Sequence, residues 1–436
     1  MYLRKGLHIN ALGHLEIGGC DCVELAHEFG TPLYVYDEDY LRARCSGYTE
    51  ALKKYAPGGA AAYASKAFLT TAMAVIMKQC GMWLDCVSLG ELYVAKKAGF
   101  PAEHIILHGS NKTDMELQTA LDMGVGRIVL DSTEEIERLA EMCEEAGKRQ
   151  MVFLRVNPGV DAHTHSYIQT ARVDSKFGVG ADEALDALKL ILAKPGLELR
   201  GIHTHLGSQI FDLNAFDDGC KKVAALMAEL RDATGTVLPE VNLGGGFSVH
   251  YTDADAPVEP EESIQHVAAA LKSAIAPYDY PVPALFVEPG RSVVAEACVT
   301  LYTVGAIKII PGIRKYVSID GGLADNPRPA LYHAEYEAAL ANRMNETELE
   351  PVRISGRSCE TDTLIESVML PAPKRGDILA VFTSGAYQYA MASNYNRVPI
   401  PAVVLAKDGN AALMVRRQTV EELTQYDSVP EWLDKE

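Results

Sequence analysis

Short apolar runs alternate with helix-like stretches in the central part of the chain, between about residues 60 and 290. Strands that alternate with helices pair in parallel and are joined by crossovers. The eight runs are Ala60–Ser65, Trp83–Cys86, His104–His108, Arg127–Leu130, Met151–Val156, Glu198–His205, Glu240–Leu243 and Ala284–Val287. Because eight parallel strands close a (β/α)8 barrel, the sequence predicts an α/β fold of this TIM type.

The stretches between the runs have the apolar spacing of helices. They include Ser132–Ala146, Asp182–Ala193, Ala215–Ala233 and Glu261–Ala276. An open doubly wound sheet is the competing fold, and it would place a glycine-rich loop after the first strand. The chain has Ser65-Lys66-Ala67 at that place, which favours the barrel.

The pattern changes after about residue 295, where strands broken by Gly and Pro turns predict a β-rich domain. These strands are Cys298–Ile310, Arg314–Asp320, Glu350–Ser355, Asp377–Phe382 and Ala402–Ala406. The segment Leu15–Tyr36 is expected to join this domain, and a helix is expected only from Glu421 onward. The polar stretch Arg343–Glu350 is expected to be an exposed or mobile loop. The predicted domains are 38–292 for the barrel, and 1–37 with 293–436 for the β-rich domain.

Composition and charge narrow the classes of function. The 436 residues are 48 % hydrophobic and 23 % charged, without a run of 18 apolar residues that could cross a membrane. The net charge of −19 disfavours binding to nucleic acid or to an anionic membrane. The N-terminus lacks the apolar stretch of a signal peptide, so a cytoplasmic location is expected.

Cysteine usage indicates reduced thiols. Nine cysteines are an odd number in a chain without an export signal, which argues against a disulfide framework. Cys20 and Cys22 have no second pair at zinc-ligand spacing, so no metal site is expected.

Residues capable of chemistry follow four of the predicted strands. They are Ser65-Lys66 after the first strand, His203-Thr-His205-Leu-Gly-Ser208 after the sixth, Gly244-Gly245-Gly246 after the seventh and Glu288-Pro-Gly290-Arg291 after the eighth. In barrel enzymes the working residues lie at these carboxyl ends, which share one mouth. The four groups are therefore expected to face one another.

Together these groups suit pyridoxal 5′-phosphate. Backbone N–H groups of the glycines and the Ser208 hydroxyl can hold a phosphate, and a lysine amine can attack the cofactor's aldehyde. Glu288 can keep the pyridine nitrogen protonated, and His205 supplies a flat ring. Each group alone has a simpler explanation: a solvated lysine, a glycine turn or a packed histidine. Their joint occurrence in strand order favours the cofactor.

Several motifs resemble those of diaminopimelate decarboxylases, which are fold-type III pyridoxal-phosphate enzymes. The motifs lie in the family's order from about residue 11 to 425. They are Gly30-Thr-Pro-Leu-Tyr-Val-Tyr36, Tyr63-Ala-Ser-Lys66-Ala, Arg155-Val-Asn-Pro-Gly-Val160, Asp174-Ser-Lys-Phe-Gly178, His203-Thr-His-Leu-Gly-Ser-Gln209, Gly244-Gly-Gly-Phe247, Glu288-Pro-Gly-Arg291, Arg328-Pro-Ala-Leu-Tyr332, Cys359-Glu360, Gly385-Ala-Tyr387 and Met391-Ala-Ser-Asn-Tyr-Asn396. The resemblance implies an alanine racemase-like barrel, decarboxylation of meso-2,6-diaminopimelate to L-lysine, and a homodimer with shared active sites.

The resemblance also implies a role for each site residue. Lys66 would carry the cofactor covalently, His205 would stack on its ring and Glu288 would pair with its nitrogen. The phosphate would be held by Ser208, Gly245, Gly246, Gly290, Arg291 and Tyr387. The substrate would be bound by Arg291, Arg328, Tyr332, Glu360 and Tyr387. Cys359 would donate a proton from the neighbouring subunit, and Tyr395 is expected only to pack.

The chain departs from the family pattern at three places. Ala67-Phe68 stands where Ala-Asn is common, and Ala171 replaces a usual glycine. The stretch Cys359-Glu-Thr-Asp-Thr363 stands where Cys-Glu-Ser-Gly-Asp is usual, so the aspartate lies one position earlier. This last change leaves open a decarboxylase of a related amino acid, such as a carboxylated polyamine or a siderophore-linked or carrier-bound substrate. The alternative of another class is a non-catalytic pyridoxal-phosphate-binding regulator.

Overall fold

The computed structural model describes residues 3–159 and 175–433. The chain forms two compact units. The barrel unit comprises Leu41–His250 and Ala254–Val294. The β-rich unit comprises Met1–Tyr40, Tyr251–Asp253 and Ala295–Glu436. These bounds differ by a few residues from the predicted ones, and the short segment Tyr251–Asp253 was not expected in the β-rich unit.

The barrel unit is a closed ring of eight parallel strands, which confirms the predicted fold. The strands are β5 (Ala60–Ala64), β6 (Trp83–Cys86), β7 (Ile105–Leu107), β8 (Arg127–Leu130), β9 (Gln150–Asn157), β11 (Leu197–His203), β12 (Glu240–Asn242) and β13 (Ala284–Val287). The ring is closed by two pairings, of β13 with β5 and of β8 with β9. The short strand β10 (Val179–Gly180) adds to β9. Each strand coincides with a predicted apolar run to within two residues.

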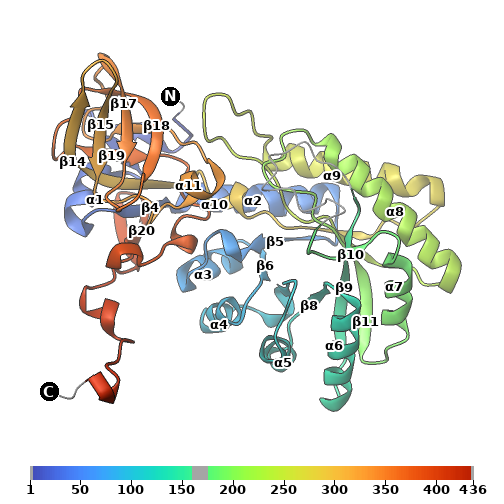
Figure 1. Ribbon diagram of the computed structural model, residues 1–436. Helices are drawn as coiled ribbons and strands as arrows, with labels where there is room; N and C mark the ends of the chain where they lie inside the picture. Colours follow the sequence, from blue (N-terminus) through green and yellow to red (C-terminus); the bar gives the residue numbers. More distant parts are fainter. Residues whose placement is uncertain (1–2, 160–174, 434–436) are drawn as a thin grey trace. The chain divides into compact units, whose positions relative to one another are not determined.

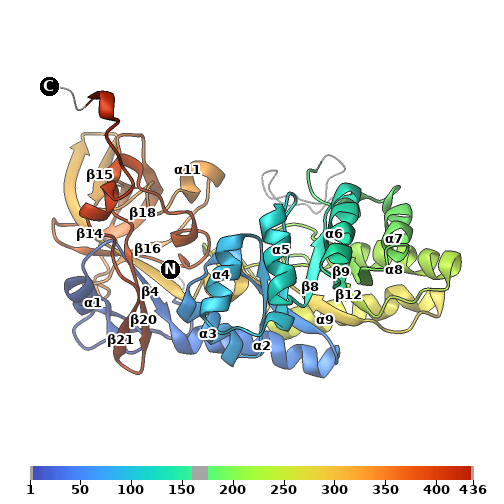
Figure 2. The same ribbon diagram turned by 90° about the horizontal axis from the view of Figure 1, so that it is seen from below.

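Helices surround the barrel strands in the two views of Figures 1 and 2. They are α2 (Glu38–Tyr55), α3 (Thr71–Gln79), α4 (Leu89–Lys97), α5 (Asp114–Met123), α6 (Thr133–Glu145), α7 (Ala184–Leu192), α8 (Asn214–Thr234) and α9 (Pro260–Ile275). Ser88, Thr113 and Ser132 each accept a backbone N–H at the start of a helix. These caps fix where the chain turns from loop to helix, and so help to set the length of each loop at the mouth.

The barrel interior is filled by side chains and is not a channel. Ala62, Ile106, Val129, Phe153 and Phe286 form one buried cluster. At the amino ends of β8 and β12, Arg127 and Glu240 form a buried two-pronged ion pair with N–O distances of 2.9 and 2.8 Å. Ion pairs at the amino ends of barrel strands contribute to stability, whereas catalytic residues usually lie at the carboxyl ends.

The β-rich unit is built around a sheet in the order β18-β17-β15-β14-β4-β20-β21, with β19 paired to β14 and β16. Its strands are β4 (Leu33–Asp37), β14 (Cys298–Ile310), β15 (Arg314–Ile319), β16 (Ala338–Leu340), β17 (Leu349–Ser355), β18 (Thr363–Pro371), β19 (Ile378–Val381), β20 (Ala402–Lys407) and β21 (Asn410–Val415). A small sheet of β1 (Leu7–Ile9), β2 (Leu15–Ile17) and β3 (Cys20–Asp21) and helix α1 (Cys22–Phe29) share its core. The N-terminal segment therefore belongs to this unit, as expected. Two short helices remain: α10 (Arg291–Val294) belongs to the barrel unit, and α11 (Arg328–Tyr332) belongs to the β-rich unit.

One local expectation was wrong and another was confirmed. From Glu421 to the last described residue, Leu433, a helix was expected, but the chain forms only the single turns Glu421–Thr424 and Glu431–Leu433, because these residues bury no apolar face. The stretch Arg343–Glu350 is an exposed loop over most of its length, as expected. Its start is held in place, since Arg343 lies 3.1 Å from Asp377 and also pairs with Glu346.

All nine cysteines lie in the described part of the chain and are free thiols, eight of them buried or half-buried and Cys359 exposed. Among residues 3–159 and 175–433, no helix is long and apolar enough to cross a membrane.

Candidate active site

Lys66 lies in a single helical turn, Ser65–Ala67, that directly follows barrel strand β5. Its neighbours Ser65 and Ala67 are buried, whereas the lysine is exposed. Its positive charge acts to lower the pKa values of both Asp85 and His205. The lysine amine is therefore close to side chains from two other strand ends.

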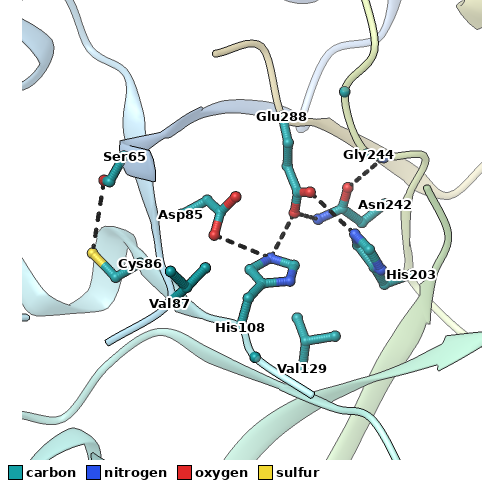
Figure 3. A network of polar contacts seen from close by, with 12 residues as sticks. Ser65, Asp85, Cys86, Val87, His108, Val129, His203, Asn242, Gly244 and Glu288 are labelled. Carbon is teal, nitrogen blue, oxygen red and sulfur yellow. Dashed lines mark hydrogen bonds and ion pairs between the residues drawn. The ribbon is translucent and has the colours of Figure 1, made fainter. Parts of the chain in front are cut away.

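Glu288 follows strand β13 and is the centre of a buried polar network (Figure 3). Its Oε2 accepts a hydrogen bond from His203 Nε2 at 3.1 Å, and its Oε1 accepts one from Asn242 Nδ2 at 2.7 Å. His203 and Asn242 are the last residues of strands β11 and β12. The carboxylate is thus oriented from two neighbouring strands.

His108 approaches the same carboxylate from the end of strand β7. Its Nε2 atom lies 2.7 Å from Glu288 Oε1 and 3.8 Å from Asp85 Oδ1. All four side chains are buried, so the charges in this group act through a medium of low polarity. Burial raises the pKa of Asp85, and the Glu288 carboxylate adds to that rise.

The network holds Glu288 ionised. Burial alone would raise its pKa, but the nearby His108 and His203 rings keep it well below the usual value. Burial lowers the pKa of His203 to about 4, so this ring is neutral near pH 7 and donates through Nε2–H. We assign this tautomer because Nε2 faces the carboxylate, while the buried Nδ1 has no hydrogen-bond partner among the described residues.

His205 follows strand β11 with its ring half-buried. Its Nδ1 accepts the backbone N–H of Gly245 at 3.2 Å, which leaves no proton on that atom. Burial, followed by the positive charges of Lys66 and Arg155, holds its pKa well below the usual value. A neutral flat ring therefore lies at the mouth beside the glycine loop.

The glycines after strands β12 and β13 lie in tight backbone contact with neighbouring loops. A Cβ at Gly245 would lie 2.2 Å from the Glu288 carbonyl oxygen, and one at Gly246 would lie 2.5 Å from the Gly207 carbonyl oxygen. A Cβ at Gly290 would lie 2.8 Å from Ala64 Cβ. Only glycine fits such close approaches. Within the described residues, neither Gly246 nor Gly290 donates a backbone hydrogen bond. Both N–H groups can therefore donate hydrogen bonds to a bound anion such as a phosphate.

The Arg291 guanidinium adds a positive charge to this loop cluster. Arg291 is buried and donates from Nη2 to the Ser208 hydroxyl at 3.0 Å. The barrel unit thus brings eight predicted residues to one end of its strands. They are Lys66, His205, Ser208, Gly245, Gly246, Glu288, Gly290 and Arg291.

In the β-rich unit, Arg328 is surrounded by tyrosines. It is buried at the start of α11 and donates from Nε to the Tyr336 hydroxyl at 3.0 Å. Its guanidinium carbon lies 5.4 Å from the ring centres of both Tyr332 and Tyr387. Burial acts to lower the pKa of Arg328, but the surrounding tyrosines raise it on balance. The three predicted substrate residues Arg328, Tyr332 and Tyr387 therefore form one cluster.

Cys359 and Glu360 form a second cluster in the β-rich unit, on an exposed turn. The backbone N–H of Cys359 donates to Asn396 Oδ1 at 3.0 Å, and the Tyr395 hydroxyl donates to Glu360 Oε1 at 2.6 Å. The expectation that Tyr395 only packs was wrong, because its side chain is 37 % exposed and its hydroxyl binds a predicted substrate residue.

Sequence reasoning missed five of the residues that build these clusters: Asp85, His108, Asn242, Tyr336 and Asn396. His108 and Asn242 could have been found, because both lie at the carboxyl end of a predicted strand, His108 as the last residue of one run and Asn242 as the last but one of another. Asn396 could not, since its contact with Cys359 joins residues that are 37 positions apart. Of the family motif residues, Val160, Asp174 and the departure at Ala171 lie outside the described residues.

A metal ion is a second candidate occupant of the network. Ligand-capable atoms of His108, His203 and Glu288 all lie within 4.8 Å of one another. A carboxylate offers about four acceptor positions; His203 and Asn242 use two of them, and His108 Nε2 lies 2.7 Å from Oε1. Because His203 Nε2 donates its proton to this carboxylate, that atom has no lone pair for a metal, so the network fits a protonated pyridine nitrogen better than a metal ion.

Comparisons with known proteins agree with this geometry. Residues 39–295 match the family model for the pyridoxal-binding domain of pyridoxal-dependent decarboxylases. The chain is 46 % identical over 430 residues to the diaminopimelate decarboxylase of Bacillus subtilis (strain 168), covering 98 % of each protein.

Solved structures give the same result. The diaminopimelate decarboxylase of M. jannaschii in complex with L-lysine is 33 % identical, with a TM-score of 0.91 over 98 % of this chain and 99 % of that one. The Helicobacter pylori enzyme, also with L-lysine, is 30 % identical, with a TM-score of 0.85 over 92 % of this chain and 98 % of that one. On these grounds, the chain belongs to the diaminopimelate decarboxylase family of pyridoxal-dependent decarboxylases.

Proposed function

We propose that the protein decarboxylates meso-2,6-diaminopimelate to L-lysine and CO2, the last step of lysine biosynthesis, with pyridoxal 5′-phosphate as its cofactor. The observation that carries the proposal is the barrel mouth, where an amine, a neutral imidazole, an ionised carboxylate and a glycine loop gather from four strand ends. The likeness to the B. subtilis enzyme along almost the whole chain supports the choice of substrate.

The residues of the barrel mouth fit the cofactor. Lys66 would bind its aldehyde carbon, His205 would lie against its ring and Glu288 would accept a hydrogen bond from its nitrogen. Ser208 and the backbone N–H groups of Gly246, Gly290 and Arg291 would hold the phosphate, with Tyr387 as a further predicted phosphate ligand. Gly245, whose N–H donates to His205, would contribute by letting the loop approach the cofactor closely. When bound, the cofactor supplies an electron sink for the bond that breaks.

Glu288 is the residue on which that chemistry depends most. An ionised carboxylate favours the protonated form of a neighbouring nitrogen. The hydrogen bonds from Asn242 and His203 keep the carboxylate itself free of a proton, so the shared proton would stay on the ring nitrogen. In this proposal the hydrogen bonds to Glu288 keep the proton on the cofactor's ring nitrogen before the substrate binds.

Substrate recognition is assigned to charged groups that match diaminopimelate. The substrate carries two carboxylates and two ammonium groups, and arginine forks bind carboxylates through two parallel N–H bonds. We assign the carboxylates to Arg291 and Arg328, assisted by Tyr332 and Tyr387. Glu360 would bind the distal ammonium. Its exposed carboxylate and its bond from Tyr395 support this role.

Cys359 is proposed as the proton donor. Loss of CO2 leaves an electron pair on the α-carbon, and that carbon must gain one proton. The Cys359 thiol is the one exposed thiol of the chain. We propose that it serves the site of a neighbouring subunit in a homodimer. A cytoplasmic location is part of the same proposal.

The test is a product assay on protein supplied with pyridoxal 5′-phosphate. Formation of L-lysine and CO2 from meso-diaminopimelate, with no turnover of L-ornithine or L-arginine, would support the proposal. A decarboxylase of a related amino acid would turn over carboxynorspermidine or another candidate in preference to diaminopimelate. A regulator would bind the cofactor and release no CO2 from any of them.

A further inference from the structure

Asp362 lies two residues after Glu360, at the place where the family usually has glycine. Its backbone is left-handed, with φ +37°, a conformation that aspartate tolerates better than most residues do. Its backbone oxygen accepts the Gly356 N–H at 2.7 Å. The turn that carries Cys359 and Glu360 is thereby closed on itself.

The Asp362 carboxylate bridges two backbone segments. Its Oδ2 accepts the N–H of Ser358 at 2.9 Å, within the turn, and its Oδ1 accepts the N–H of Leu323 at 2.8 Å, outside it. Hydrogen bonds from backbone N–H groups to a carboxylate are stronger than those between neutral groups. The side chain therefore fastens the turn to the segment around Leu323.

Two glycines make room for this carboxylate. A Cβ at Gly322 would lie 2.4 Å from Asp362 Oδ2, and a Cβ at Gly356 would lie 2.2 Å from the same atom. Any larger residue at either position would displace the carboxylate. The backbone around Asp362 is thus shaped to receive it.

The segment around Leu323 leads to Arg328. Gly322 accepts the N–H of Asn326 at 2.7 Å, and its own N–H donates to Asp325 at 2.8 Å. These bonds make residues 322–326 a compact loop that ends next to α11. Movement at Leu323 would therefore be transmitted toward the arginine.

We propose that Asp362 is a positioning residue that holds the Cys359–Glu360 turn in register with the loop leading to Arg328. This inference rests on the proposed function, because it assigns Glu360 to the substrate ammonium and Cys359 to the proton. Through Asp362, the turn that carries the proposed ammonium ligand and proton donor is held to the loop that leads to Arg328. The family usually has its aspartate one residue later. In this chain the Asp362 carboxylate acts as a clasp, that is, it joins the backbone N–H groups of Ser358 and Leu323.

The experiment compares Asp362→Ala and Asp362→Asn with the wild type. Asp408→Ala is the matched control, because Asp408 also has a left-handed backbone, with φ +50°, in the same unit, and its carboxylate makes no described hydrogen bond. Hydrogen exchange measured by mass spectrometry gives a readout that is independent of turnover. We expect faster exchange at both the 319–326 and the 355–364 peptides in Asp362→Ala, and no change in the control.

Kinetics then separate positioning from general destabilisation. A displacement of about 1 Å at a catalytic group can cost about a hundredfold in rate, so we expect kcat to fall and KM to rise by about tenfold to a hundredfold. Asp362→Asn should lie between the two, since its single oxygen can accept only one of the two N–H groups. Cofactor absorption should match that of the wild type, because the barrel unit is unchanged.

A double variant tests the route of action. If Asp362 acts on KM through Glu360, Asp362→Ala should raise KM less than about twofold further in a Glu360→Gln background. Full additivity of the two KM effects would overturn the inference, as would wild-type kinetics and exchange in Asp362→Ala. A wild-type protein that does not turn over diaminopimelate would refute the proposed function instead, while the exchange result would still test the clasp.

Discussion

Asn242 donates its amide N–H to Glu288 over 2.7 Å, while its amide oxygen accepts the Gly244 N–H at 2.9 Å. The second bond fixes which end of the amide faces the carboxylate. The glycine loop and the carboxylate are therefore oriented by one side chain. The predicted phosphate site and the predicted ring-nitrogen site are thus built on a common support.

Asn242→Asp should weaken cofactor binding. A second carboxylate beside Glu288 would raise the pKa of Glu288 by like-charge repulsion. The substitution would also remove the amide N–H that Asn242 donates to Glu288. Loss of one bond in a buried network costs about 1–3 kcal/mol, which corresponds to about a tenfold to hundredfold weaker affinity. Titration of cofactor-free protein with pyridoxal 5′-phosphate measures this affinity. Asn214→Asp, on the exposed start of α8, is the control, and equal affinities of the two variants would contradict the role of Asn242.

His203 should make folding stability depend on pH. Its pKa is about 4 in the folded protein and about 6.5 in an unfolded chain. Between these values only the unfolded state binds the proton, so the free energy of unfolding should fall as the pH drops from about 6.5 to 4. The loss attributable to this ring amounts to roughly 3 kcal/mol.

Denaturant unfolding of the cofactor-free protein at several pH values measures this effect, with His203→Gln for comparison. Glutamine can still donate to Glu288 but does not titrate, so the variant should lose less stability on acidification than the wild type does. Parallel curves for the two proteins would show that His203 does not carry the effect.

Glu360→Gln should raise KM for diaminopimelate more than it lowers kcat, because the neutral amide cannot pair with the distal ammonium. We expect an increase in KM of about tenfold or more, since a hydrogen bond to a charged group is worth about 1.5–3 kcal/mol. Tyr395→Phe should give a smaller rise, because water can replace the lost hydroxyl at this exposed site. Tyr426→Phe, at a side chain that is 90 % exposed, is the control. An unchanged KM in Glu360→Gln would remove this residue from substrate binding.

Mixed dimers should recover activity. If Cys359 serves the neighbouring subunit, mixing inactive Lys66→Ala with inactive Cys359→Ala would form hybrids in which one site has both residues intact. We expect up to about a quarter of wild-type activity, because random exchange makes half of the dimers hybrid and each hybrid has one intact site of two. No recovery, with subunit exchange demonstrated by mass spectrometry of tagged chains, would assign the cysteine to its own subunit.

The barrel could be predicted from the sequence because its strands are buried on both faces and read as continuous apolar runs. The strands of the β-rich unit were harder to predict from the sequence. Strands such as β16, with three residues, and β21, with mostly exposed or half-buried positions, leave a weak pattern. The C-terminal segment has helix-forming residues but buries none of them, so tertiary contacts do not support a helix there.

Some residues of the candidate site could be predicted from the sequence, and others could not. Side chains at strand ends, such as Glu288 and Lys66, could be predicted because the barrel fixes where its strands end. The roles of Asp362 and Asn396 could not be predicted, because their hydrogen-bond partners Leu323 and Cys359 are distant in the sequence. The sequence marked Asp362 as a departure from the family, but its meaning as a clasp needed the position of the Leu323 N–H.

The most direct test of the central claim is to locate the covalently bound cofactor. Protein loaded with pyridoxal 5′-phosphate is reduced with borohydride and digested, and the modified peptide is identified by mass spectrometry. We predict a single pyridoxyl adduct on the peptide that contains Lys66, and no adduct in Lys66→Ala. An adduct on another lysine in the wild type, or none at all, would contradict the account.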